Sequence, residues 1–506
     1  MTLPLISTSR QAEKDAPVAH TALGVLRGTW IDGVAAFLGV PYASPPVGPL
    51  RFAPASPAHP WSGQFDATRH GPISPQLPPR LSAIMGNSVP RRQDEDCLTL
   101  TIRTLAPDTK ARPVLVWLHG GAWLSGSGSD DRHDGTRLAC EGDLVIVGVN
   151  YRLGALGWLH RSGIVDTEAG TSDMIAALSW VRDHIAGFGG DPANVTIMGQ
   201  SAGAMSIGRL LMLPEARGLF GRVIMQSSGL GRGFYPSSVA TERGDQFLRL
   251  LDIDPHANDA LQRLRAIPVP RILQAQSDFA RANARFGWNT PPFMPVSPVE
   301  MTEVETLAVI ADGVTSGSDF GGKDVLIGAN ADEMHAFFAP DPAMVDPPAA
   351  SVTARFGGEA MHAHYRARRP GGTAMDLLAD LGTDETYLRP TMRLADAVAT
   401  RGGNAYAYFF DWAPPTSRMK SCHTIELPFV FGTLESQRDL PMLAGGDAAQ
   451  MADLSTAMRR AWAAFARFGN PAHGGVPTWP RYDVTRRPTM RFGTRIGVIN
   501  DPAGLR

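Results

Sequence analysis

The sequence contains little cysteine, no long apolar run and no excess of either charge. Only three of its 506 residues are cysteines, and Cys97, Cys140 and Cys422 lie far apart. Such sparse thiols argue against a disulfide framework and for a reducing compartment. The start, residues 1–16, is polar and charged and lacks the apolar stretch of a secretory signal. We therefore expect a cytoplasmic protein.

The charges are nearly balanced, with 47 basic against 49 acidic residues and a net charge of −2. No global field therefore favours nucleic acid or an anionic membrane, and we expect neither as a partner. No stretch reaches the roughly 18 apolar residues that a membrane-spanning helix needs. With 43% hydrophobic residues, the chain is long enough to bury a large core.

Apolar runs alternate with segments of helical spacing along most of the chain. Continuous apolar runs predict buried strands at residues 113–118, 144–151, 195–198, 220–226 and 324–330. Between them, Met174, Ala177, Leu178 and Val181 recur on one face of a predicted helix. Strands that alternate with helices predict an α/β fold with a large, mostly parallel, twisted sheet flanked by helices.

We expect one large domain rather than several separable ones. Residues 1–18 have the composition of a flexible tail, and residues 19–506 form the predicted domain. Two mainly helical insertions, at about residues 229–320 and 333–400, interrupt the strand pattern. Ligands of open α/β sheets bind at the carboxyl ends of the strands. We therefore expect the insertions to lie over that edge and to shape a substrate gorge.

The segment Gly199-Gln-Ser-Ala-Gly203 directly follows one of the predicted strands and precedes a predicted helix. In that setting G-x-S-x-G is typical of a nucleophile elbow, which holds a serine hydroxyl at the tip of a strand. The glycines allow the strand and the helix to approach each other closely. The pattern also arises by chance, so an ordinary loop serine remains the alternative for Ser201 until its partners are found.

A serine nucleophile needs an imidazole as its base and a carboxylate to orient that imidazole. In the α/β-hydrolase order the acid and then the base follow the serine, each in a loop after a strand. The acid candidates are Asp332 and Glu333, directly after the strand at 324–330, and spacing does not decide between them. The base candidate is His423, downstream of a predicted aromatic strand at 404–412.

Acyl transfer also requires an oxyanion hole, in which backbone N–H groups face the oxygen that becomes negative. The segment His119-Gly-Gly-Ala122 lies at the tip of the strand at 113–118, and its small residues let a carbonyl approach the backbone. The expected donors are the N–H groups of Gly121, Ala122 and Ala202, the last being the residue after the nucleophile.

Together these blocks resemble the type-B carboxylesterase and cholinesterase family of α/β-hydrolases, particularly bacterial carboxylesterases of the para-nitrobenzyl-esterase kind. Further matching blocks are Phe37-Leu-Gly-Val-Pro-Tyr-Ala, Glu95-Asp-Cys-Leu-Thr-Leu, Asn150-Tyr-Arg-Leu-Gly, Phe188-Gly-Gly-Asp-Pro, Met225-Gln-Ser-Ser and Ala461-Trp-Ala-Ala-Phe. Each block is weak alone, but the ordered set is specific. The resemblance implies an α/β-hydrolase fold and a catalytic triad of Ser201, Glu333 and His423.

The sequence departs from this family at two positions. The residue before the nucleophile is usually Glu, and here it is Gln200; Ala122 stands where the family usually has a third glycine. Because Gln200 is neutral, one negative charge fewer lies beside the nucleophile, and we expect cationic substrates to be attracted only weakly. This favours small to medium uncharged esters as substrates. Ser227 and Glu426 resemble family positions that would support Glu333 and the loop of the catalytic histidine.

We therefore expect a carboxylic ester hydrolase that forms a covalent acyl-enzyme and needs no cofactor. His362 and His364 lack the carboxylate or cysteine ligands that would complete a metal site, so we expect no metal. Two alternatives remain. The same machinery serves amides, carbamates and lactones, and some relatives have lost the serine and only bind partners. The sequence leaves the natural ester and the oligomeric state, monomer or homodimer, open.

Overall fold

The computed structural model describes residues 15–316 and 322–505, and its largest element is an eleven-stranded sheet. From one edge to the other its strands are β16 (Gly497–Asn500), β15 (Pro488–Phe492), β14 (Ala405–Phe410), β13 (Asp324–Asn330), β10 (Arg222–Gln226), β9 (Gly190–Gln200), β7 (Arg112–Leu118), β8 (Val145–Val149), β6 (Thr99–Thr104), β4 (Val34–Pro41) and β3 (Thr29–Ile31). Two small sheets contain β1 (Val18–Thr21), β2 (Gly24–Arg27) and β5 (Gln64–Asp66), and β11 (Tyr235–Pro236) and β12 (Val296–Ser297).

The middle of the large sheet, from β15 to β8, is parallel. Within it β9 lies between β7 and β10, and Thr196 is paired with both Leu115 and Arg222. Antiparallel strands close the two edges, with β16 at one and β6, β4 and β3 at the other. The predicted large, mostly parallel sheet is therefore confirmed.

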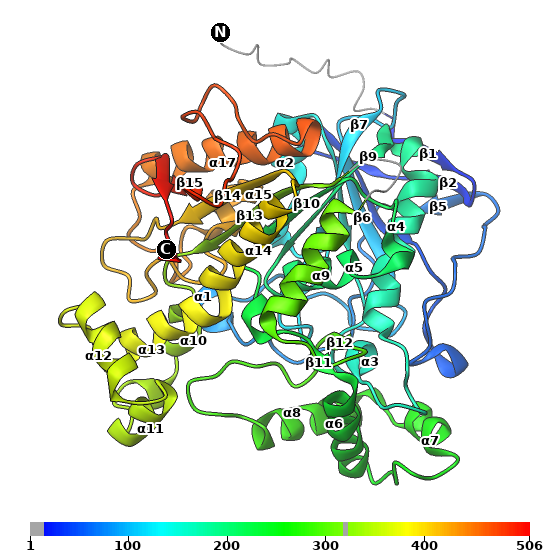
Figure 1. Ribbon diagram of the computed structural model, residues 1–506. Helices are drawn as coiled ribbons and strands as arrows, with labels where there is room; N and C mark the ends of the chain where they lie inside the picture. The colour runs from blue at the N-terminus through cyan, green and yellow to red at the C-terminus, as the bar shows by residue number, and fades with distance from the viewer. Residues whose placement is uncertain (1–14, 317–321, 506) are drawn as a thin grey trace.

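Helices cover both faces of the sheet (Figure 1). One face carries α4 (Ala169–His184), α5 (Ala202–Leu211), α9 (Glu303–Thr315) and α14 (Arg389–Thr400), and the other carries α2 (Thr136–Gly142), α15 (Leu427–Phe431) and α17 (Ala448–Phe468). The residues of β7 alternate between the two resulting cores. Val114 and Val116 pack into one, and Leu115 and Trp117 into the other, because successive side chains of a strand point to opposite faces.

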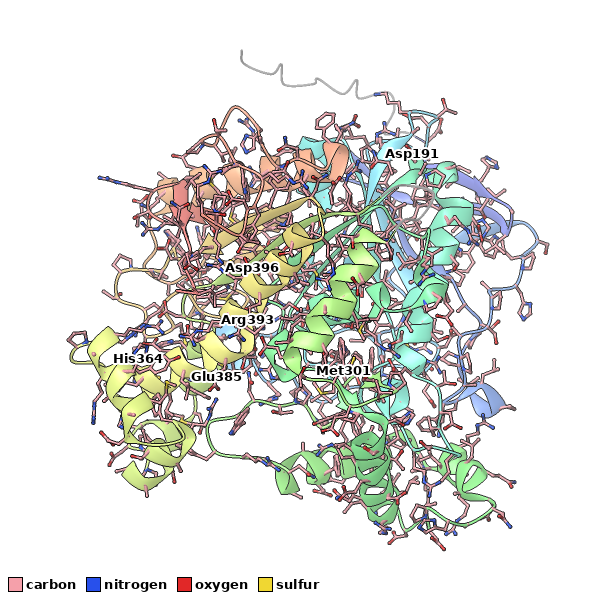
Figure 2. The ribbon with its side chains drawn as sticks, viewed as in Figure 1. Asp191, Met301, His364, Glu385, Arg393 and Asp396 are labelled. Carbon is pink, nitrogen blue, oxygen red and sulfur yellow. The ribbon has the colours of Figure 1, made fainter. Side chains whose placement is uncertain are left out.

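The remaining helices lie in the connections. They are α1 (Ser82–Met85), α3 (Gly154–Trp158), α6 (Ser237–Leu250), α7 (Ala260–Ala266), α8 (Val269–Ala282), α10 (His335–Phe338), α11 (Ala349–Arg355), α12 (Glu359–Arg368), α13 (Ala374–Thr383) and α16 (Leu434–Gln437). Helices α6 to α8 and α11 to α13 gather beyond one end of the sheet (Figure 1). Figure 2 labels Asp191, near the start of β9, at the opposite end, so these helices lie at the carboxyl end of that strand. Among the described residues, no helix has the length and apolarity needed to cross a bilayer.

Each expected insertion, 229–320 and 333–400, includes a helix that flanks the sheet, namely α9 and α14. These two helices pack against each other, and α14 also contacts β13 and β14. The expected tail, residues 1–18, lies mostly outside the described residues. At its end the Pro17 carbonyl accepts the N–H of Gly28 at 2.8 Å, and β1 begins at Val18.

Candidate active site

The chain turns directly from β9 into α5 at Ser201, which has φ 57° and ψ −122°. A positive φ is strained for a residue with a side chain, and such strain persists where the surrounding structure imposes it. Here the neighbouring glycines impose it. A Cβ on Gly199 would lie 2.6 Å from the carbonyl carbon of Gly203, and a Cβ on Gly203 would lie 2.0 Å from the Leu118 carbonyl oxygen. The half-buried Ser201 consequently stands at the tip of β9.

The loop after β7 faces this turn. Gly121 has φ 110° and Ala122 has φ 57°, and a Cβ on Gly121 would lie 2.0 Å from the carbonyl oxygen of Ser125. Within the described residues, the N–H groups of Gly121, Ala122 and Ala202 have no hydrogen-bond partner, and all three residues line the same cleft as Ser201. Their N–H groups are therefore available to an oxygen atom bound there.

His423 and Glu333 meet although 90 residues separate them. The Nδ1 atom of His423 lies 2.5 Å from Glu333 Oε2, and both side chains are buried. Glu333 is itself held, because its Oε1 accepts the N–H of Asn330 at 2.8 Å and its carbonyl accepts the N–H of His423 at 3.2 Å. A carboxylate at Nδ1 fixes the tautomer that leaves Nε2 free to accept a proton.

The neighbouring carboxylate of Asp332 has other partners. It forms an ion pair with Arg369 at 3.1 Å and accepts the N–H of Ser421 at 3.3 Å. The structure therefore brings Glu333 to the histidine and directs Asp332 to an arginine.

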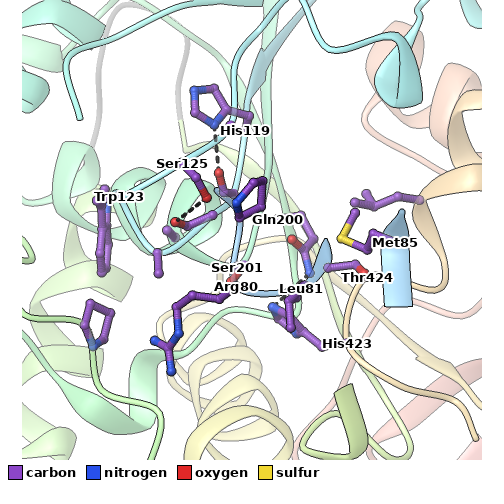
Figure 3. A pocket seen from close by; sticks show the side chains of 18 of the residues that line it. Arg80, Leu81, Met85, His119, Trp123, Ser125, Gln200, Ser201, His423 and Thr424 are labelled. Atoms are coloured by element: carbon purple, nitrogen blue, oxygen red, sulfur yellow. Dashed lines mark hydrogen bonds between the residues drawn. The ribbon is translucent and has the colours of Figure 1, made fainter. Parts of the chain in front are cut away.

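The other ring nitrogen of the histidine faces the segment before the turn. His423 Nε2 lies 3.2 Å from Gln200 Nε2 (Figure 3). An amide N–H that donates to an unprotonated Nε2 requires the proton on Nδ1, in agreement with the contact to Glu333. Ser201 and His423 line one cleft, but among the described residues no hydrogen bond joins Ser201 Oγ to His423. In ligand-free enzymes such hydrogen bonds are often long and tighten when substrate binds.

Glu426, predicted as a supporting residue, is fully buried. Its carboxylate accepts hydrogen bonds from Asn330 Nδ2 at 2.7 Å and Gln226 Nε2 at 3.2 Å. Asn330 Nδ2 also donates to the Cys422 carbonyl at 2.9 Å, so Asn330 connects Glu426 with the loops of both Glu333 and the histidine. Sequence reasoning missed Asn330, whose only signal is a polar side chain at the end of a buried strand. Burial, together with the negative charge of Glu333, raises the pKa of Glu426 to about 7.

Ser227, the other residue expected to support the site, contacts the neighbouring strand through its backbone. Its N–H donates to the carbonyl of Gly328 in β13 at 2.8 Å. Its buried hydroxyl has no hydrogen-bond partner in the part of the chain that the structure describes. The backbone hydrogen bond joins the residue after β10 to β13, and the expectation that Ser227 supports Glu333 stays a prediction.

The residues around Ser201 line a cleft that encloses about 880 Å³, part of it open to solvent (Figure 3). Aromatic rings from the 333–400 segment cover the imidazole of His423. The ring centroids of Phe337 and Tyr387 lie 5.3 Å and 5.0 Å from it. These rings were not predicted from the sequence, where nothing separates them from ordinary core aromatics. Among the described residues, no group of three or more His, Cys, Asp or Glu could hold a metal ion.

Comparison with known proteins places the chain in a family. The model of the Carboxylesterase family matches residues 15–501. The chain belongs to the carboxylesterase family. It is 37% identical to phenmedipham hydrolase of Pseudarthrobacter oxydans, over 92% of this chain and 93% of that protein. It is 35% identical to para-nitrobenzyl esterase of Bacillus subtilis (strain 168), over 96% of each. A solved carboxylesterase structure from Geobacillus stearothermophilus matches with a TM-score of 0.83 and 34% identity, covering 96% of this chain and 98% of that one.

These comparisons confirm the resemblance to type-B carboxylesterases and the α/β-hydrolase fold. The protein is a carboxylesterase of the serine hydrolase class and hydrolyses carboxylic esters.

Proposed function

We propose that this carboxylesterase hydrolyses small to medium uncharged esters through a triad of Ser201, His423 and Glu333 and a covalent acyl-enzyme. The observation that carries the proposal is the 2.5 Å contact between His423 Nδ1 and Glu333 Oε2, at the wall of the cleft that also contains Ser201. That contact orients the imidazole and stabilises the positive charge that forms when Nε2 takes a proton.

In the first half of the reaction, Ser201 Oγ attacks the ester carbonyl carbon while its proton passes to His423 Nε2. The carbonyl electrons move to the oxygen, which receives hydrogen bonds from the N–H groups of Gly121, Ala122 and Ala202. The tetrahedral intermediate then collapses, and the bond to the alcohol oxygen breaks. The leaving alkoxide takes the proton from Nε2 and departs as the alcohol. The acyl group stays bound to Ser201 Oγ.

In the second half, water gives a proton to His423 Nε2 as its oxygen adds to the acyl carbon. Collapse of the second tetrahedral intermediate releases the carboxylic acid and returns the proton to Ser201 Oγ. Atoms and charges balance over the cycle without a cofactor. Gln200, whose amide contacts Nε2 at 3.2 Å, holds the imidazole between turnovers, and Glu426 and Ser227 support the loops around it.

We also propose that residues 19–506 form a single domain in which the inserted segments shape access to the serine. The cleft lining supports this arrangement. Arg232, Asn289 and Pro291 come from the first segment, and Phe337 and Tyr387 come from the second. Substrate size would then be set by these side chains rather than by the sheet.

The test is Ser201→Ala. We expect kcat/KM for 4-nitrophenyl butyrate to fall by more than about a thousandfold, because the hydroxyl that attacks the ester is gone. The melting temperature should change little, since serine and alanine differ by one oxygen atom and the Ser201 hydroxyl has no hydrogen-bond partner among the described residues. A fluorophosphonate probe should label the wild type and not the variant.

Three outcomes would contradict the proposal. Undiminished turnover by Ser201→Ala would exclude this serine as nucleophile. If kcat/KM were higher for an amide than for the ester of the same structure, amides would be the preferred substrates instead of esters. A folded wild type that neither reacts with the probe nor turns over any ester would favour a non-catalytic binding protein.

A further inference from the structure

Two arginines line the active-site cleft without a carboxylate partner. Arg80 and Arg232 both belong to its lining, and neither forms an ion pair among the described residues. A third lining arginine, Arg132, is paired with Asp130 at 2.5 Å, and Asp130 is the only acidic residue among the described residues that line the cleft. Two positive charges in the cleft therefore remain uncompensated.

Arg232 is held by neutral groups close to the candidate base. Its Nη2 atom donates to Asn289 Oδ1 and to the hydroxyl of Tyr387, the latter at 3.1 Å. Its guanidinium lies over the Tyr387 ring, 5.2 Å from the centroid, and the same ring lies 5.0 Å from the imidazole of His423. Asn289 and Tyr387 are buried. These contacts fix the direction of the guanidinium and leave its charge in place.

Arg80 extends into the cleft from the segment before α1 (Figure 3). Its Nη1 atom donates to the Asn289 carbonyl at 3.4 Å, and its side chain is exposed to the solvent in the cleft. Partial desolvation, together with the positive charge of Arg232, lowers the pKa of Arg80. Both guanidinium groups donate to the same residue, Asn289, so they lie close enough to repel each other, and an anion bound between them would relieve that repulsion.

Arg80 also lines a second cavity of about 1630 Å³, partly open to solvent, which shares Ser125 and Pro291 with the active-site cleft. Three further arginines line it, Arg243, Arg281 and Arg285, and no Asp or Glu of the described residues does. Arg281 is neutralised by Asp278 on α8. Arg243 instead donates to the Asn283 Oδ1 atom at 3.2 Å and keeps its charge. The cavity beside the active-site cleft is therefore positive although the chain as a whole is not.

We propose that the cleft accepts uncharged esters but prefers esters that carry a second, ionised carboxylate, with Arg80 and Arg232 binding that carboxylate while Ser201 attacks the ester. Half-esters of dicarboxylic acids are the simplest members of this class. The planar guanidinium matches a carboxylate in shape and donates paired hydrogen bonds to it. This inference rests on the proposed function of Ser201. Uncharged esters remain substrates but lack the additional binding.

The experiment compares anionic esters with neutral esters of similar size. Monoethyl adipate carries its free carboxylate in the acyl part, and ethyl hexanoate is its neutral match. 4-Acetoxybenzoate carries its free carboxylate in the alcohol part, and its methyl ester is the neutral match. In the wild type we expect kcat/KM to be at least about tenfold higher for the anionic member of one pair. A factor of about ten is what one charge-assisted hydrogen bond to the substrate would contribute. Added salt should lower kcat/KM for that member and leave its neutral match unchanged.

Variants separate charge from structure. Arg80→Gln and Arg232→Gln should each lower the ratio of kcat/KM for the anionic ester to kcat/KM for the neutral ester about tenfold. Arg80→Lys keeps the positive charge and should retain most of that ratio. Arg182→Gln is the matched control. Arg182 lies on α4, is exposed and is paired with Asp183, so its loss should not change the ratio.

The inference is overturned if the wild type favours the neutral member of both pairs. It is also overturned if the two glutamine variants lose activity on neutral and anionic esters equally, because the arginines would then be structural. Either result leaves the proposed function standing, since turnover of the neutral esters and its loss in Ser201→Ala are measured separately.

Discussion

The imidazole of His423 has a polar partner at each ring nitrogen. Glu333 Oε2 lies 2.5 Å from Nδ1, and Gln200 Nε2 lies 3.2 Å from Nε2. The first partner is charged and buried, so it stabilises a protonated ring; the second is neutral and lies toward the cleft. An imidazole held in this way has one tautomer and one orientation, which is what the proposed proton transfer from Ser201 requires.

Replacing the charged partner should therefore damage catalysis more than folding. For Glu333→Gln we expect kcat to fall by about 10⁴-fold, since an amide can favour the wrong tautomer and does not stabilise imidazolium. KM for neutral esters should change little. Steady-state kinetics on 4-nitrophenyl butyrate measures both constants.

The next residue along the chain supplies the control. Asp332 has the same charge but pairs with Arg369 instead of the histidine, so Asp332→Asn should lose far less activity. Equal losses in both variants would mean that the orientation of Glu333 has no special role.

Some of these residues could be predicted from the sequence, and others could not. The position of Ser201 between a strand and a helix could, because the strand, the two glycines and the helix are neighbours in the sequence. The choice of Glu333 over Asp332 came from the family resemblance alone, since it depends on an arginine located 37 residues away. The two cleft arginines were beyond prediction, because an unpaired charge is defined by what surrounds it in space.

At the scale of secondary-structure elements, the central strands were predictable because their apolar runs are buried on both faces. The predicted runs at 113–118 and 324–330 match β7 and β13 closely. The helices α9 and α14 were assigned to insertions instead of to the sheet. An amphipathic pattern shows that a helix buries one face, but it does not show which layer receives that face.

The junction of β9 and α5 makes a prediction at this scale. Gly203→Ala should lower both activity and stability, because the added Cβ would lie 2.0 Å from the Leu118 carbonyl oxygen at the end of β7. Overpacking of this kind typically costs about 1–3 kcal/mol, and the shift in backbone would also move Ser201.

Gly474→Ala is the matched control for that variant, since a Cβ at Gly474 would meet no atom within 4 Å. Its free energy of unfolding should stay within about 0.5 kcal/mol of the wild type. Denaturant unfolding and ester turnover check both variants. A stable and fully active Gly203→Ala would show that strand and helix can separate at the elbow without cost.

At the scale of the whole molecule, net charge is a poor guide to the charge of the site. The chain carries a formal charge of −2, yet Arg80 and Arg232 leave the cleft positive. Most other arginines are matched by carboxylates, as in the buried pair of Arg152 with Asp173 at 2.6 Å. Local imbalance within a balanced total attracts an anionic substrate to one place without making the entire surface basic.

The stability of the whole fold should depend on pH through Glu426. Its pKa is raised from 4.5 to about 7 in the folded protein by burial and by Glu333, so between these values the folded state binds more protons than the unfolded state. Stability from this group is therefore present below pH 4.5 and is lost as the pH rises through about 7. The loss amounts to at most about 3 kcal/mol.

Glu426→Gln removes the titrating group, so the free energy of unfolding of the wild type relative to this variant should fall across that pH range and level off above it. Denaturant unfolding at a series of pH values measures the difference, which is informative even if the amide itself shifts the absolute stability. Glu435→Gln, which removes an exposed carboxyl on α16, should preserve the pH dependence of the wild type. A constant difference between wild type and Glu426→Gln would mean that the pKa of Glu426 is not raised in the folded protein. Because Asn330 and Gln226 both donate to its oxygens, ionisation would then be maintained by hydrogen bonds strong enough to offset both burial and the charge of Glu333.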